Sequence, residues 1–119
     1  MVELKRLLTV RESLMRRMEF VANLPTVCDA NWFESLMRDI LDLPDCIRCL
    51  LGAVRESGAP SYCVERLESF LEKLTLVLSN SSWPESVGEY RMCFSTPEWN
   101  EIKMEAANLV RTFGPVLQA

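Results

Sequence analysis

Two cysteines form the one Cys-x-x-Cys pair of the sequence, Cys46-Ile47-Arg48-Cys49. Such a pair does redox chemistry where it opens a helix after a strand, and it binds structural zinc where a second pair or histidines complete four ligands. The sequence has no histidine and no second pair, and nothing before Cys46 is patterned as a strand. We therefore expect no metal or other cofactor, and we expect all five cysteines to be small core residues: Cys28, Cys46, Cys49, Cys63 and Cys93.

Three carboxylates, Glu65, Glu68 and Glu72, share one face of a predicted helix at spacing i, i+3 and i+7. Paired carboxylates can act as general acid and base, but this face is predicted to be solvated. The absence of histidine removes the commonest general base and the usual catalytic triads. Neither of the glycine-rich phosphate-binding patterns, GxxxxGK[ST] or GxGxxG, occurs. The sequence therefore predicts no catalytic residues, and we expect the protein not to be an enzyme.

Composition and length favour one globular domain spanning residues 1–119. Apolar residues make up 49% of the 119 residues, which is enough for a core of its own. The longest apolar run, from Cys49 to Val54, is too short to cross a bilayer, and the first residues do not resemble a secretory signal. An odd number of cysteines favours a reducing compartment, so cytosol or nucleus is expected.

The charge is unevenly distributed along the chain. The formal net charge is −4, yet residues 1–20 contain five basic and three acidic side chains. The basic ones are Lys5, Arg6, Arg11, Arg16 and Arg17. This polarity could orient the protein toward an acidic partner. The simpler interpretation is a solvated helix face.

A helical hairpin from Leu43 to Leu78 is predicted at the centre of the chain. Apolar residues recur at helical spacing in both of its arms, and Ser57-Gly58-Ala59-Pro60 separates the arms. Gly58 suits a C-terminal cap and Pro60 suits the start of the next helix. A break this short requires the arms to be antiparallel.

Further helices are predicted on both sides of the hairpin. A first helix should run from Val2 to Asn23, and a second should follow Asp29 or Asn31 and end near Leu41, before Asp42 and Pro44. A short helix is expected around 85–94. A last helix should start at Ser95-Thr96-Pro97 and stop at Gly114-Pro115. Nothing is patterned as a strand, so we expect an all-α fold of five to six antiparallel amphipathic helices, as a helical bundle or a short α-solenoid.

Trp83 lies between serines and a proline in the most loop-like segment of the sequence. If its ring is exposed, it is a candidate anchor for a protein partner. The other interpretation is that Trp83, like Trp99 and the methionines, belongs to the core.

Three ordered segments resemble the C-terminal domain of the regulatory subunit of katanin, the microtubule-severing complex. Residues 33–51 resemble the family's two short helices that end in a paired leucine. Cys63, Leu67, Phe70, Leu71 and Leu74 resemble its cysteine-and-leucine helix. The closing stretch 109–117, Leu-Val-Arg-Thr-Phe-Gly-Pro-Val-Leu, is the most specific match. The similarity covers nearly the whole chain. It is a similarity to the C-terminal domain alone, without the β-propeller that precedes this domain in the long regulatory subunits.

The resemblance implies a non-enzymatic regulatory subunit that binds the N-terminal helical domain of a catalytic AAA ATPase and promotes microtubule binding and severing. Its implied partners are that ATPase, tubulin and spindle-pole proteins, with no nucleic acid or membrane. Its implied location is the cytoplasm, the cytoskeleton, the spindle and the spindle poles. On this basis the five basic residues of the first helix are expected to make the electrostatic contact, and Phe113, Pro115 and Val116 are expected to contact the partner's helices.

A second hypothesis is a helical signalling adaptor of the death-domain superfamily, which acts by homotypic assembly. Residues 50–70 have a passing similarity to the end of a caspase-recruitment domain. The predicted helices 2–23 and 61–78 are longer than that fold usually contains, so the katanin-type interpretation is preferred.

Overall fold

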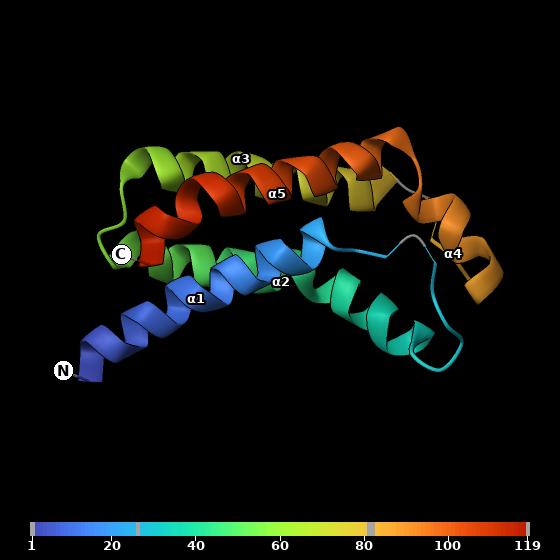
Figure 1. Ribbon diagram of the computed structural model, residues 1–119, viewed down its shortest axis with the longest axis horizontal. Helices are drawn as coiled ribbons and strands as arrows, with labels where there is room; N and C mark the ends of the chain where they lie inside the picture. Colours follow the sequence, from blue (N-terminus) through green and yellow to red (C-terminus); the bar gives the residue numbers. More distant parts are fainter. Residues whose placement is uncertain (1, 26, 81–82, 119) are drawn as a thin grey trace.

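Four long helices and one short helix form the described part of the chain (Figure 1). The computed structural model describes residues 2–25, 27–80 and 83–118, and describes their side chains from 10 to 115. The helices are α1 (Val2–Ala22), α2 (Phe33–Glu56), α3 (Ser61–Asn80), α4 (Val87–Phe94) and α5 (Pro97–Gln118). These ranges contain no strand, so the predicted all-α class is confirmed. The predicted end of the first helix is correct to within one residue.

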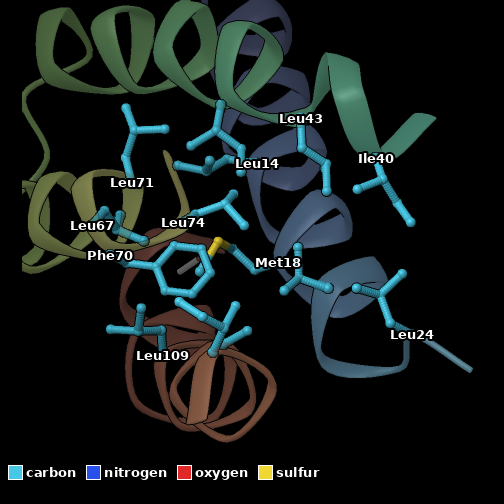
Figure 2. Packing of buried hydrophobic residues seen from close by; sticks show 14 of the residues in the cluster. Leu14, Met18, Leu24, Ile40, Leu43, Leu67, Phe70, Leu71, Leu74 and Leu109 are labelled. Carbon is cyan, nitrogen blue, oxygen red and sulfur yellow. The ribbon is translucent and has the colours of Figure 1, made fainter. Parts of the chain in front are cut away.

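The four long helices close into a ring. Helix α1 packs against α2 and α5, and α3 packs against the same two helices from the other side. In a solenoid each repeat would contact only its neighbours in sequence. Of the two predicted architectures, the arrangement is therefore the helical bundle and not the solenoid. Figure 2 shows leucine and methionine side chains from all four helices, including Leu14, Met18, Leu43, Leu74 and Leu109, converging on one interior. No charged side chain among the described residues is buried there.

Helix α2 corrects the prediction that Asp42 and Pro44 separate two helices. It is one helix of 24 residues with Pro44 inside it. Proline lacks the N–H that would bond to Ile40, and its ring crowds that carbonyl, so the helix bends instead of ending. Figure 1 shows α2 changing direction after its first turns. Leu36, Ile40, Leu43 and Ile47 are buried on both sides of the bend, and this shared burial holds the two halves together.

The turn between α2 and α3 forms as predicted. Gly58 has φ of 82°, the left-handed conformation that glycine adopts without strain, and its N–H bonds to the carbonyl of Arg55 at 3.3 Å. The hydroxyl of Ser57 donates to the carbonyl of Val54 at 2.6 Å. The last carbonyls of α2 are therefore satisfied by the turn itself.

Helix α5 begins as predicted but does not end at Gly114. The hydroxyl of Thr96 accepts the N–H of Trp99 at 3.4 Å, as expected of an N-cap followed by Pro97. At the other end the helix continues through Gly114 and Pro115 to Gln118. Gly114 is buried and does not have positive φ, so it cannot form the left-handed stop that was predicted.

An aromatic cluster beside α4 closes one end of the bundle. The ring of Phe94 lies 4.7 Å from that of Tyr90 and 4.8 Å from that of Trp99, measured between centroids. The hydroxyl of Tyr90 donates to the carbonyl of Pro25 at 2.8 Å, which ties α4 to the loop after α1. Burial, followed by the nearby Cys28, raises the pKa of Tyr90 to about 12.

Candidate functional site

The Cys46–Cys49 pair lies in the middle of α2, three residues apart on an uninterrupted helix. Cys46 is half-buried and Cys49 is exposed, so the prediction that every cysteine is a core residue is wrong for Cys49. Among the described residues no group of three or more cysteine or carboxylate side chains is placed to hold a metal ion. Cys28 and Cys63 are buried as predicted, and burial raises the pKa of both thiols.

Of the carboxylates Glu65, Glu68 and Glu72, the last two line a hollow of about 650 Å³ between α2 and α3, and Glu65 does not. Glu65 and Glu72 are exposed, and Glu68 is half-buried because it pairs with Arg55 of α2. This ion pair joins the two arms of the hairpin on the solvent side. Glu68 is therefore engaged in a contact between α2 and α3.

The basic residues of α1 have different environments. Arg16 and Arg17 are exposed, and Arg16 pairs with Glu12 at 2.6 Å, the i, i+4 pair expected on this helix. Arg11 is half-buried: its Nε donates to the hydroxyl of Ser57 at 3.0 Å and its Nη2 donates to the carbonyl of Ser57 at 3.1 Å. It therefore fastens α1 to the end of α2. Lys5 and Arg6 lie on α1, and their side chains are outside the described residues.

A surface patch surrounds Phe113 at the end of the bundle where α2 meets α3. We call it the Tyr62 patch, and it consists of Tyr62, Arg66 and Phe113. The ring of Phe113 is 3% exposed because the ring of Tyr62 lies 5.8 Å from it and the guanidinium of Arg66 lies 5.7 Å from it. Tyr62 is 57% exposed, and Arg66 is exposed as well. The patch is thus an aromatic surface with a cationic edge.

Of the three predicted contacts near the end of the chain, only Pro115 is seen to be exposed to solvent, and no described contact joins it to the Tyr62 patch. Phe113 is covered, and the side chain of Val116 is outside the described residues. Sequence reasoning missed Tyr62 and Arg66, which lie about fifty residues away from Phe113. The exposed aromatic residue at the start of α3 was the available indication, but nothing in the sequence pairs it with Phe113.

Trp83 is half-buried rather than exposed. Its ring packs edge-on against Phe94, with 6.1 Å between centroids, so it belongs to the aromatic cluster beside α4. Residues 81 and 82, which precede it, are outside the described range. Two other apolar side chains, Leu76 of α3 and Met92 of α4, are exposed to solvent.

Comparisons with protein-family models, curated proteins and solved structures found no match. The katanin resemblance therefore depends on the residue pattern alone. None of the described helices is both long and apolar enough for a bilayer span.

Proposed function

We propose that the chain is a regulatory, non-enzymatic subunit that binds the N-terminal helical domain of a katanin-type AAA ATPase and promotes microtubule binding and severing at the spindle. The observation that carries this proposal is the position of the segment with the most specific resemblance. Its Phe113 lies in the Tyr62 patch, where an exposed tyrosine and an exposed arginine accompany it. Exposed tyrosine and arginine are the residue types that most often anchor protein interfaces.

The charge of α1 supports a role beside an acidic filament. Arg16 and Arg17 are exposed on consecutive positions, and in Figure 1 the first turns of α1 diverge from α2. Exposed basic groups would mainly accelerate the encounter with the acidic microtubule surface, and salt would weaken their effect. Arg11 contributes less to this contact, because its guanidinium is engaged with Ser57. ATP hydrolysis in the complex would belong to the catalytic partner.

The helix lengths favour this proposal over the death-domain alternative. Four helices contain 21, 24, 20 and 22 residues, whereas the alternative is built from about six short helices. The single short helix, α4, has 8 residues.

Co-expression tests the proposal. The tagged chain is produced together with a katanin-type catalytic subunit, and the captured material is separated by size-exclusion chromatography. We expect a heterodimer that remains associated at micromolar concentration. Two separate species at that concentration would refute the proposal, and filaments of the lone chain would support the adaptor instead.

A further inference from the structure

An exposed leucine on α3 lies between hollows on both of its sides. Leu76 is 62% exposed and borders a hollow of about 650 Å³ shared with α2, one of about 590 Å³ shared with α4, and one of about 210 Å³ shared with α5. We call this continuous surface the Leu76 groove. Met92 of α4, 78% exposed, forms part of its wall, and methionine adapts readily to the shape of a partner. A large apolar side chain so exposed beside hollows is suited to contact another molecule.

The charges around the groove are unbalanced. Its three basic side chains each already have a carboxylate partner: Arg48 pairs with Asp45, Arg55 with Glu68, and Lys73 with Glu105. Three carboxylates at its edges, Glu72, Glu98 and Glu101, form no ion pair within the described ranges. The charge available to a ligand is therefore negative.

The acidic side chains of α5 are arranged along the groove. Glu98, Glu101 and Glu105 are spaced i, i+3 and i+7, so they form a row along about 10 Å of the helix, parallel to the apolar floor beside Leu76. Two basic residues about one turn apart on a second helix would match Glu98 and Glu101, the two members of the row that form no ion pair in the described ranges. The apolar side chains of that helix would enter the hollows.

We propose that the Leu76 groove binds a basic amphipathic helix of another protein. Its apolar stripe would pack on Leu76 and Met92, and its lysines or arginines would pair with Glu98 and Glu101. The described part of α1 is also basic, but its apolar residues Leu14, Met15 and Met18 are buried in the bundle. A second copy could not offer that face without unfolding.

The Leu76 groove is separate from the Tyr62 patch and does not depend on the proposed function. Leu76 and Tyr62 are fourteen positions apart on α3, which corresponds to about 21 Å along the helix. One partner at each surface would make the bundle a scaffold that holds two proteins together.

The test uses the full chain and a labelled synthetic peptide of about 18 residues, which is about five helical turns. The peptide has leucines at i, i+3, i+4 and i+7 with flanking lysines, and the matched control peptide has glutamate in place of every lysine. By fluorescence anisotropy we expect micromolar binding of the lysine peptide, weaker at high salt, and at least about tenfold weaker binding of the glutamate peptide. No binding of the lysine peptide, or equal binding of both peptides, would overturn the proposal.

Matched variants localise the binding. Leu76→Gln should weaken it about tenfold, since it removes apolar area that the peptide would bury, whereas Leu41→Gln at another exposed leucine should not change it. The double variant Glu98→Gln/Glu101→Gln should weaken binding and reduce its salt dependence, while Asp39→Asn/Asp42→Asn should do neither. Equal effects of the two leucine variants would overturn the proposal. A self-association of the chain that Leu76→Gln abolishes in sedimentation velocity would overturn it in favour of a second copy.

Discussion

Tyr90→Phe is the substitution whose effect the structure defines most closely. The side chain is 0% exposed, stacks on Phe94, and gives its one polar hydrogen to the carbonyl of Pro25 at 2.8 Å. Phenylalanine preserves the ring and its packing and removes only the hydroxyl. We expect the variant to be about 1–2 kcal/mol less stable to unfolding at pH 7, because the hydrogen bond is lost and the partly buried carbonyl of Pro25 loses its partner.

At alkaline pH the order of stability should reverse. The pKa of Tyr90 is about 12 in the folded protein and about 10 in the unfolded chain, so from pH 10 upward the unfolded chain loses a proton that the folded protein retains. The stability contributed by the protonated hydroxyl is complete below pH 10 and is lost as the pH rises toward 12. The loss amounts to about 1.4 kcal/mol at pH 11 and approaches about 2.7 kcal/mol above pH 12.

Urea unfolding followed by tryptophan fluorescence, in reducing buffer at intervals from pH 7 to 11.5, measures this difference. The contributions of Lys103, Tyr62, Cys63 and Cys93 are common to both proteins and cancel in the comparison, whereas that of Cys28, whose charge acts on Tyr90, does not cancel completely. We expect the wild type to be the more stable protein at pH 7 and the two stability curves to converge or cross near pH 11. A constant difference between wild type and Tyr90→Phe across this range would refute the reasoning that burial holds the proton on Tyr90.

Three further outcomes are expected. Phe70→Ala removes a fully buried ring of α3 and should lower the free energy of unfolding, measured in urea, by about 3–5 kcal/mol. A decrease of less than about 1 kcal/mol would mean that the interior is not closely packed around this ring. Gly58→Ala should destabilise the folded protein by about 1 kcal/mol, because residue 58 has positive φ. Gly52→Ala should stabilise it by about 0.5–1 kcal/mol, because residue 52 lies inside α2 with open space around it. Changes of the same sign in the two variants would contradict the turn geometry. Reversing Arg16 and Arg17 to glutamate should weaken microtubule co-sedimentation at low salt without changing the circular dichroism spectrum, and unchanged binding would leave these residues as a solvated face.

Helical periodicity predicted α1, α3 and the α2–α3 turn well, because one apolar stripe and one local cap determine each of them. It failed where a local helix breaker competes with burial. Pro44 and Pro115 were both predicted to mark helix boundaries, yet each lies inside a helix. At Pro44 the buried residues Ile40, Leu43 and Ile47 continue through the bend, and such tertiary packing cannot be read from the local pattern.

The candidate surfaces were less predictable than the helices, since both depend on contacts between distant residues. The sequence indicated Phe113 but gave no means of placing Tyr62 and Arg66 beside it. Likewise, the net charge could not show that Lys73 is paired with Glu105 while Glu98 and Glu101 have no ion pair in the described chain. Arg11 illustrates the same limit, because its hydrogen bonds to the end of α2 appear only in the fold.

Isothermal titration of the purified chain with the N-terminal helical domain of a katanin-type catalytic subunit tests the proposed function most directly. We expect a one-to-one complex with a dissociation constant in the micromolar range or below. Tyr62→Ala should weaken it about tenfold by removing an exposed aromatic anchor, and Trp32→Ala, at an exposed aromatic residue outside the Tyr62 patch, should leave it unchanged. The absence of binding heat, or equal affinity for wild type and Tyr62→Ala, would contradict the assignment of this patch to the catalytic partner.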